Sequence, residues 1–593
     1  MSEVKTRIFL SENSPDHRND PMKPGAWITP ASPDGLTKKQ VEIVMCLLAF
    51  YVRPTAYSSS EWNLWHGLVC RVLVEPPAAI RHRSRFGQRS ARMLDRANAA
   101  VLRLYLQKHQ RLGRRVHVTR AVAAAWLKKF PGARRSEYAR RVCAGHAGVG
   151  VTPHVKCEAT APGKKVRIIQ GFDRYTMDAQ AYSGPVVEEL TRRMHEEHPP
   201  GSPIVPCGGF NGEEVGLHTE HAINHVVSSL TLGLVRAAIE HIPNLHTVCG
   251  LQDDNALATY EVMRDYLALA PRDKRRFHTD EFQELVLGPQ AAQIAVAIAE
   301  DPRIFFFELD VDKMDTSVRS STRQVLSRLY RRAGMPRRGV HVLHKLRTIH
   351  GREGKIKYFA PYGNVSGASD TYLLNLILNV ANLDFALSVS QERGVTTLVS
   401  GDDAFGVGGR GVANYLAAYP RTGMSVTTKV TGSIFECTFL GSWFLPSEVG
   451  YLPTPLLGRC LFKAAMSRDR HLPADVLAGR WALTLAHTAS HDPVLGRYLR
   501  TVARQGRTPV SKYKLRNAGV HTPTYEGVAC HLLRYGVVWR RGLHPFVERA
   551  ILLKDGIIRP DFPATPWETQ WLCTNTPGVD RSIYPRTNMP SYG

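Results

Sequence analysis

The chain lacks the features that mark secreted, zinc-ribbon or membrane-spanning proteins. Its 593 residues include 10 cysteines, and none of them forms a Cys-x2-Cys pair. This spacing provides neither a zinc-ribbon pattern nor a disulfide framework, so we expect a reducing compartment. The N-terminus lacks the apolar core of a signal peptide, and the longest apolar run, residues 41–52, is too short to span a bilayer. We therefore expect no transmembrane segment, and any membrane association to be peripheral.

Acidic residues are also scarce relative to basic ones. The chain has 77 Lys and Arg against 52 Asp and Glu, a formal net charge of +25, whereas its 43% hydrophobic content is typical of a soluble globular protein. Such a charge predicts a polyanionic partner, nucleic acid first and an anionic membrane surface second. In residues 81–141 basic side chains alternate with Leu and Trp, which predicts folded, largely helical structure. Their single sign favours phosphate contacts over a solvated helix face. A helix is also expected over residues 38–52.

Two adjacent carboxylates lie in the sequence Ser400–Asp403. A β-branched run precedes this segment and an apolar run follows it, which predicts a hairpin whose turn presents Asp402 and Asp403. Paired carboxylates on an exposed turn bind hard cations, and Gly401 allows a close approach of the backbone. A second pair, Asp253–Asp254, has no such strand before it, so we interpret it as part of a solvated loop or helix end.

Two further acids follow a strongly apolar segment. The run Ile304–Leu309 predicts a buried strand that ends in Asp310. Asp315 comes five residues later, ahead of a helix-like segment, so both acids can face one site although only Asp310 would reach a metal ion. We interpret Asp312, between them, as a structural residue.

Basic residues alternate with apolar ones in the interval 156–170. After a Pro-Gly turn, Lys165 and Arg167 are separated by Val166, as on a strand with one basic face. Such a strand can hold a triphosphate, and it can equally be an ordinary surface strand.

A loop and an apolar helix are predicted in residues 363–383. Ser366-Gly367 form the flexible loop, and the helix begins near Asp370. Thr371 and Asn375 are four residues apart and therefore share one helical face. An Asn in an apolar helix needs a hydrogen-bond partner, either within the core or in a ligand.

In their order along the chain these segments resemble the motifs of viral RNA-dependent RNA polymerases. Motifs A, B and C of the palm are matched by Asp310-x4-Asp315, Ser366-Gly367-x3-Thr371-x3-Asn375 and Gly401-Asp402-Asp403. The basic segment from Lys156 to Gln170 resembles motif F, Lys429 is placed like the motif D lysine, and Phe439–Ser442 is similar to motif E. The forms of these motifs look most like those of tombusvirus, nodavirus and ourmia-like replicases of positive-strand RNA viruses.

The resemblance implies an α+β fold, that of a right-hand polymerase with an antiparallel-sheet palm, fingers and a helical thumb. The implied divisions are a basic N-terminal extension with part of the fingers (1–150), fingers with motif F (151–300), palm motif A (301–335), a fingers insertion (336–362), palm motifs B to E (363–445), and a thumb with the C-terminal region (446–593).

The resemblance also implies roles for the acids. Asp310 and Asp402 would hold two Mg²⁺ or Mn²⁺ ions, with Asp403 as a secondary ligand. Lys429 would protonate the leaving pyrophosphate. The activity implied is RNA-directed RNA polymerisation from NTPs, which replicates and transcribes a viral RNA genome.

Substrate contacts are implied for a second set of residues. Asp315 and Asn375 would meet at the ribose of the incoming nucleotide, with Thr371 as their support. The loop at Ser366 and Gly367 would let template or nucleotide approach the backbone closely. The triphosphate would be clamped by basic residues on the motif F strand: Lys156, Lys165 and Arg167.

The implied partners are RNA template and product, NTPs, and other viral or host replication proteins in the host cell cytoplasm, at membranes reached through those partners. Two alternatives remain. A reverse transcriptase shares the palm, but its hairpin usually carries an aromatic residue where this chain has Ser400. A non-catalytic RNA-binding protein could keep a polymerase-like core, although the three intact acids disfavour it.

Overall fold

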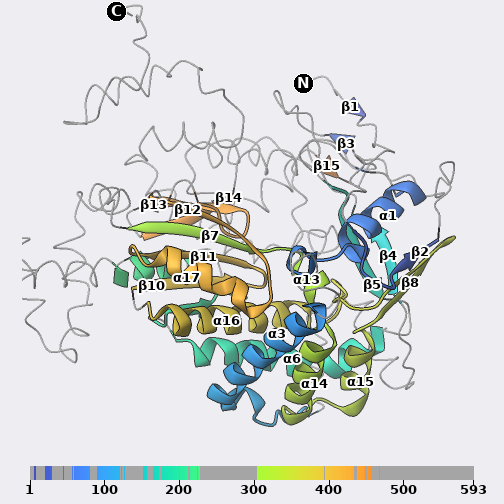
Figure 1. Cartoon of the computed structure of the whole chain (residues 1–593), viewed down its shortest axis with the longest axis horizontal. Coiled ribbons are helices and arrows are strands. Elements are labelled where there is room, and N and C mark those ends of the chain that lie inside the picture. The colour runs from blue at the N-terminus through green and yellow to red at the C-terminus, as the bar shows by residue number, and fades with distance from the viewer. Residues whose placement is uncertain are drawn as a thin grey trace, which may run out of the picture.

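The structure is a computed structural model with an α+β fold (Figure 1). It describes residues 6–7, 21–29, 44–45, 57, 59–80, 90–119, 122, 126, 151–156, 165–172, 177–199, 201–210, 214–223, 225–226, 304–392, 394–432, 434, 437–447, 450–455 and 466–467. The sheets are mostly antiparallel, in agreement with the fold class expected from the sequence. The pair Asp253–Asp254 and most of the segment 446–593 lie outside the described residues.

A five-stranded sheet, the central sheet, has the strand order β12-β7-β11-β10-β6. Its strands are β6 (Ile204–Pro206), β7 (Phe305–Val311), β10 (Val395–Ser400), β11 (Asp403–Gly408) and β12 (Val426–Thr431). All neighbours are antiparallel except β10 and β6. The alternation of strand side chains sends Phe307 into one core cluster and Phe306 into another, so both faces of the sheet are covered.

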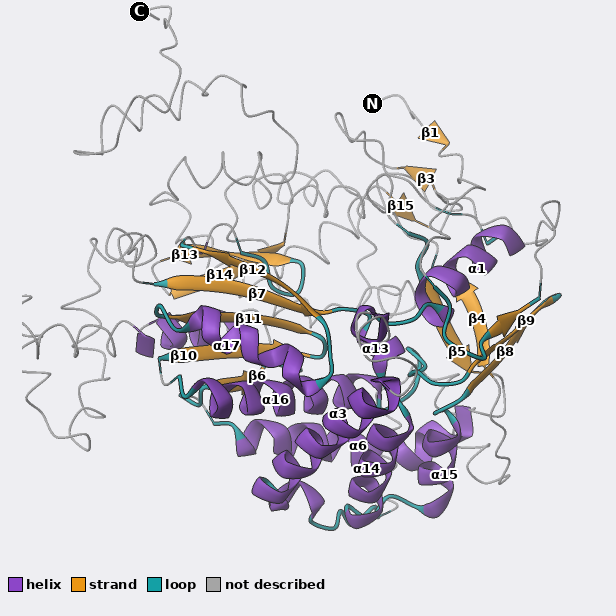
Figure 2. Cartoon of the chain, in the orientation of Figure 1, coloured by secondary structure: helices purple, strands orange, loops and turns teal. Residues whose placement is uncertain are grey.

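Helices cover one face of the central sheet (Figure 2). They are α3 (Ser90–Lys108), α6 (Met177–Glu197), α14 (Ser320–Arg332), α15 (Arg337–Lys345), α16 (Thr371–Ser390) and α17 (Val412–Ala418), with the short α13 (Met314–Ser317), η2 (Gln110–Gly113) and η3 (Tyr419–Thr422). Among the described helices, α16 alone is long and apolar enough to cross a membrane, and 67% of its most apolar stretch is buried inside the protein. Burial of this kind is also found in the core helix of a globular domain.

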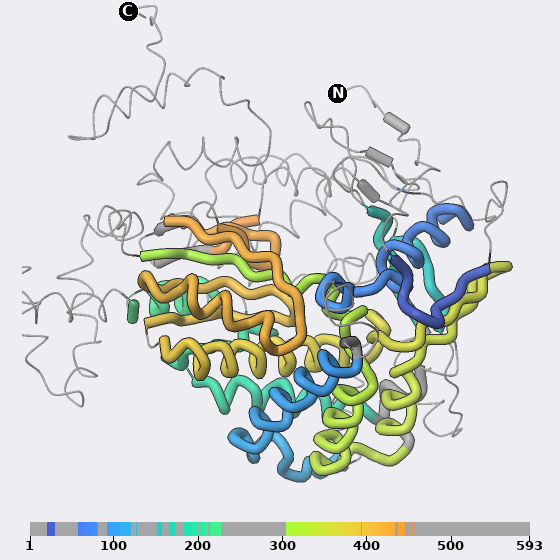
Figure 3. Tube along the Cα trace, viewed as in Figure 1, coloured from blue at the N-terminus to red at the C-terminus, as the bar shows by residue number. Residues whose placement is uncertain are grey.

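A second five-stranded sheet, the outer sheet, has the order β2-β9-β8-β4-β5. Its strands are β2 (Trp27–Ile28), β4 (Val151–Val155), β5 (Ile168–Phe172), β8 (Ile349–Glu353) and β9 (Ile356–Ala360). Figure 3 shows the N-terminal β2 beside β8 and β9 from the middle of the chain. Helix α1 (Glu61–Leu68), continued by η1 (Val69–Leu73), packs on one face, and it approaches so closely that a Cβ on Gly67 would lie 2.3 Å from Ile168.

The remaining strands are short or form a separate hairpin. They are β1 (Thr6–Arg7), β3 (Val44–Met45) and β15 (Met466–Ser467), which pair with one another, and the hairpin of β13 (Ser442–Ser447) and β14 (Gly450–Pro455). The helix expected over residues 38–52 is therefore wrong at Val44–Met45. In the segment expected to form a helical thumb, the described residues are strands.

A buried ion pair joins α14 to the start of α16. The Arg323 guanidinium donates to Asp370, and the two side chains are 1% and 0% exposed. Tyr330 donates to the same carboxylate over 3.0 Å, and Arg323 also donates to the amide oxygen of Asn364. A charge removed from water requires such partners. This network therefore fixes the helix start and the loop before it relative to α14.

Replacing Asp370 with Ala should destabilise the protein far more than breaking an exposed ion pair. The Arg323 guanidinium would stay buried without a counter-charge, at a cost of about 3–5 kcal/mol in unfolding free energy. The matched control is Glu196→Ala, whose partner Arg192 is 57% exposed, with an expected loss of about 0–1 kcal/mol. Denaturant unfolding followed by circular dichroism measures both, and equal losses would contradict the role given to the buried pair.

Candidate active site

Register in the central sheet brings two acids face to face. Asp310, near the end of β7, lies directly opposite Asp403, the first residue of β11. Residues opposed in this way have Cβ atoms about 4.5–5.5 Å apart and point to the same face. The hairpin predicted around Ser400–Asp403 is present, and its turn places Gly401 at a φ of +66°, with Asp402 between the two strands. Three carboxylates thus meet at one end of the sheet.

The electrostatics of the three acids reflect this crowding. Partial burial, followed by the charges of Asp403, Asp402 and Asp312, raises the pKa of Asp310 to about 6. Burial raises the pKa of Asp402, and a backbone hydrogen bond and the charge of Arg167 oppose that rise. Arg167 precedes β5, so the outer sheet brings a cation toward the turn. The site therefore combines repelling carboxylates with a guanidinium that partly offsets them.

The donor set suits a hard cation. Within the described ranges, no group of three or more His, Cys, Asp or Glu side chains forms a ready-made metal site. Asp310, Asp402 and Asp403 nevertheless supply the oxygen donors that Mg²⁺ and Mn²⁺ take, and a cation among them would relieve the repulsion that raises the pKa of Asp310. These residues fit divalent ions by chemistry and by their shared end of the sheet.

Asp315 and Asn375, predicted as a pair, lie in contact. Lys313 adopts a left-handed conformation (φ 51°), which turns the chain after β7 so that Asp315 falls in the first turn of α13. Asn375 of α16 donates its amide to Asp315 Oδ1 over 3.2 Å. Asn364 donates its side-chain amide to the same oxygen over 3.2 Å, and its backbone N–H to the Asp315 carbonyl over 2.6 Å.

The pair presents acceptors to a ligand. Both amides use Oδ1 of Asp315, and no described side chain donates to Oδ2. The other end of the Asn375 amide, Oδ1, is buried without a hydrogen-bond partner. Burial raises the pKa of Asp315, and the two amide bonds oppose that rise. The arrangement is suited to a ligand hydroxyl that donates, because a ligand without one leaves buried acceptors unpaired.

Two positioning residues were missed from the sequence, Asn364 and Asn379. Asn379 of α16 donates its amide to the carbonyls of Gly401 and Asp402, over 3.1 and 3.2 Å, and accepts from Tyr419 over 2.9 Å. It therefore ties the turn to the helix that carries Asn375. The sequence does indicate a buried polar residue at Asn379, which is one helical turn from Asn375 in an apolar segment. It does not indicate that the Gly401 and Asp402 carbonyls are its partners.

The loop before α16 packs against β5. Ser366 accepts a hydrogen bond from the backbone N–H of Gln170 over 3.2 Å, and a Cβ on Gly367 would lie 2.3 Å from the Gln170 carbonyl. The absence of a side chain at Gly367 thus lets the loop pack directly against β5, and the expected approach of template or nucleotide to this loop stays a prediction. Thr371 donates to the Val365 carbonyl over 2.7 Å, so it supports the loop and does not contact the Asp315–Asn375 pair.

The basic residues predicted on the motif F segment lie at the end of the β4–β5 pair. The backbone N–H of Lys156 donates to the Arg167 carbonyl over 2.8 Å. Arg71, another residue missed from the sequence, donates to the carbonyls of Val166 and Lys165 over 2.7 and 3.2 Å. This anchor holds the segment that carries Arg167 beside η1.

Lys429 lies on the edge strand β12. It is exposed and opposite Glu308, whereas Thr427, two residues earlier, is opposite Asp310. Because side chains two apart share a face, Lys429 is on the face of Asp310 but one strand repeat away from it.

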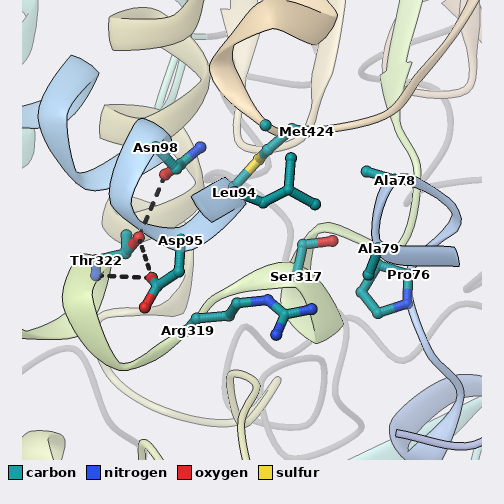
Figure 4. Close-up of a pocket in the computed structure, with 11 residues that line it drawn as sticks. Pro76, Ala78, Ala79, Leu94, Asp95, Asn98, Ser317, Arg319, Thr322 and Met424 are labelled. Carbon is teal, nitrogen blue, oxygen red and sulfur yellow. Dashed lines mark hydrogen bonds between the residues drawn. The ribbon is translucent and has the colours of Figure 1, made fainter. Parts of the chain in front are cut away.

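A pocket apart from these acids lies between α3, the start of α14 and the segment before β12 (Figure 4). Its acid, Asp95, accepts from the backbone N–H groups of Ser321 and Thr322 over 3.0 and 3.3 Å, and so caps α14. Arg319 lies against the ring of Tyr362, 4.0 Å from its centroid. These polar groups are engaged in structure, so the pocket adds nothing to the candidate active site.

No family model and no curated protein matches this chain. The geometry of the site and the motifs in the sequence are therefore what indicate a function for this chain.

Replacing Gly367 with Ala should separate the loop from β5. The added methyl group would overlap the Gln170 carbonyl, and overpacking of this kind costs about 1–3 kcal/mol. Gly394→Ala is the control, because a Cβ there meets nothing within 4 Å. Hydrogen exchange should accelerate in residues 168–172 for the Gly367 variant and stay unchanged for the control; unchanged exchange in both would show that the contact is not tight.

Proposed function

We propose that the chain is an RNA-directed RNA polymerase of the right-hand type, with the central sheet as palm and the outer sheet as part of the fingers. The observation that carries the proposal is the pairing of Asp310 with Asp403 beside the Asp402 turn, together with the Asp315–Asn375 contact. Three acids from two separate segments and the Asp315–Asn375 pair thus belong to one part of the molecule, in the order that the motifs require.

The acids would hold the metal ions and the basic residues the triphosphate. Asp310 and Asp402 would bind two Mg²⁺ or Mn²⁺ ions, with Asp403 as a secondary ligand. When bound, such ions lower the pKa of the attacking 3′-hydroxyl and stabilise the leaving pyrophosphate. Arg167 is close enough to lower the pKa of Asp402, which supports a role in orienting phosphates at the same point. Lys429 would supply a proton to pyrophosphate only if β12 or the substrate moved closer.

The Asp315–Asn375 pair would select the sugar. The single hydrogen of the ribose 2′-hydroxyl would be accepted by Asp315 Oδ2 or by Asn375 Oδ1, and a deoxyribonucleotide would supply no hydrogen to either acceptor. Asn364 acts as a positioning residue: its amide oxygen accepts from Arg323, which turns its NH₂ group toward Asp315. The acceptor-rich pair favours an RNA product over the DNA product of a reverse transcriptase.

The biological setting is the one that the sequence resemblance implies. A chain with a net charge of +25 suits RNA template and product as partners, with NTPs as substrates. We place it in the replication and transcription of a viral RNA genome in the host cytoplasm. Other viral or host replication proteins would supply capping, unwinding and peripheral attachment to membranes.

Removing the central carboxylate should abolish synthesis without unfolding the protein. Asp402→Ala loses a metal ligand but relieves repulsion with Asp310, so its melting temperature should match that of the intact protein. Incorporation of labelled NTPs on a single-stranded RNA template, with Mg²⁺ or Mn²⁺, should fall by about three orders of magnitude or more. The control is Asp312→Asn, whose carboxylate is engaged by Thr427; it should retain synthesis. Activity retained by the Asp402 variant would refute the metal assignment.

Truncating the sugar-binding amides should relax discrimination. In Asn375→Ala and Asn364→Ala, the ratio of kcat/KM for NTP over dNTP should fall about tenfold or more, because the penalty for an unpaired acceptor disappears or the Asp315 carboxylate loses its orientation. Asn382→Ala removes a buried amide of the same helix that donates to Tyr419 and serves as matched control. A ratio that is unchanged, or that falls equally in the control, would show that these amides do not sense the sugar.

A further inference from the structure

The face of the outer sheet that turns away from α1 is aromatic and basic. Side chains alternate along each strand, so Tyr358, Val151 and Val155 enter the core. The opposite face, which we call the stacking face, carries one side chain or two from each of four strands: Trp27 of β2, Lys357 and Phe359 of β9, His350 and Arg352 of β8, and His154 of β4. Helix α1 packs on the other face, where its Gly67 lies against Ile168, the residue opposite the buried Val155.

Three rings form a row across neighbouring strands. Trp27 is directly opposite Phe359, with ring centroids 6.5 Å apart and planes at 28°. Phe359 is in turn opposite His350, at 4.7 Å. Trp27 is 49% exposed, although burial of a Trp side chain is strongly favourable. His350 is exposed as well and Phe359 is half-buried, so the row leaves aromatic surface accessible to solvent.

Two like charges lie side by side next to this row. Lys357 and Arg352 are directly opposite each other on β9 and β8, and both are exposed. Like charges in this position destabilise a sheet. Neither has an ion-pair partner among the residues that the structure describes, and Glu353, the nearest acid in sequence, alternates to the other face. A polyanion on the stacking face would compensate this repulsion.

We propose that the stacking face binds single-stranded RNA, with bases on Trp27, Phe359 and His350 and phosphates at Lys357 and Arg352. Small sheets with exposed aromatic residues hold two or three bases in this way. In duplex RNA the bases are stacked inside the helix and cannot stack on these rings. A protein partner would not need two cations without ion-pair partners beside the rings. The composition is that of a stacking platform with an electrostatic track.

The stacking face leads toward the candidate active site. With strands about 4.8 Å apart, the sheet is about 19 Å wide from β2 to β5. Arg167, just before β5, follows the same alternation as Ile169, which lies opposite His154. Its charge reaches Asp402. We assign the bound strand as the unpaired template approaching the polymerase site, an identification that rests on the function proposed above, whereas the stacking itself does not.

The test is RNA binding by the full chain in the absence of NTPs. Fluorescence anisotropy with labelled U₁₂ and with a 12-base-pair RNA duplex should show that Trp27→Ala weakens single-strand binding about tenfold. Duplex binding should be unchanged, and Trp27→Phe should restore most of the single-strand affinity. The double variant Lys357→Ala, Arg352→Ala should weaken binding and reduce the slope of log affinity against log salt by about 2. Melting temperatures establish that each variant is folded.

The charge control is Arg410→Ala with Arg421→Ala, two exposed arginines outside the outer sheet, whose loss should leave the salt slope unchanged. Unchanged U₁₂ affinity in Trp27→Ala would overturn the stacking proposal, even if the basic pair proves important. Weakened U₁₂ binding in a protein that incorporates no NTP would support the stacking face and count against the polymerase. If the intact protein synthesises RNA, the Asp402→Ala variant does not, and Trp27→Ala leaves U₁₂ affinity unchanged, the polymerase is supported and the stacking face is refuted.

Discussion

The register of β7 against β11 is the constraint on which the site depends. A slip of one residue would send Asp310 to the opposite face from Asp403, because strand side chains alternate. Gly406 helps to fix this register because it lies opposite Phe307. A Cβ at position 406 would lie only 2.1 Å from the Phe307 ring, so the ring needs a glycine there. Shifting Phe307 to either neighbour of Gly406 would place the ring against a side chain. Core packing thus sets the spacing of acids at the solvent-exposed end.

Helix α16 connects this end of the sheet to the Asp315–Asn375 pair. Asn375 and Asn379 are one turn apart, so one rigid face of the helix holds both Asp315 and the carbonyls of the Asp402 turn. The Arg323–Asp370 ion pair fixes where that helix begins. Burying two charges is costly, and an apolar pair could pack as stably. Unlike an apolar pair, the ion pair leaves a second N–H group of Arg323 that donates to Asn364. This hydrogen bond orients the Asn364 amide, which donates to Asp315.

The sequence predicted elements with strong local patterns and missed contacts between distant segments. The strand before Asp310 and the hairpin were predicted from their apolar and β-branched runs, and the helix after Asp370 from its apolar periodicity. Asn364, Asn379 and Arg71 could not be assigned, since their partners are side chains or backbone carbonyls on other elements. The packing of Gly367 against the Gln170 carbonyl could not be assigned for the same reason, because a sequence indicates that a close approach is possible but not which segment approaches. The short strand Val44–Met45 exists through pairing with remote segments, which local propensity does not record.

Strand β5 links the two proposals physically. Its backbone meets the Ser366-Gly367 loop at Gln170, whose side chain donates to Tyr358 in the core beneath the stacking face. The same loop carries Asn364 and so orients Asp315. Just ahead of β5, Arg167 extends toward Asp402 from a segment anchored by Arg71. RNA on the stacking face would therefore lie on a sheet whose edge strand contacts the Ser366-Gly367 loop and follows directly on the residue whose charge acts on Asp402. Template binding and nucleotide selection would share one structural element, which makes their coupling a consequence of the fold rather than an added device.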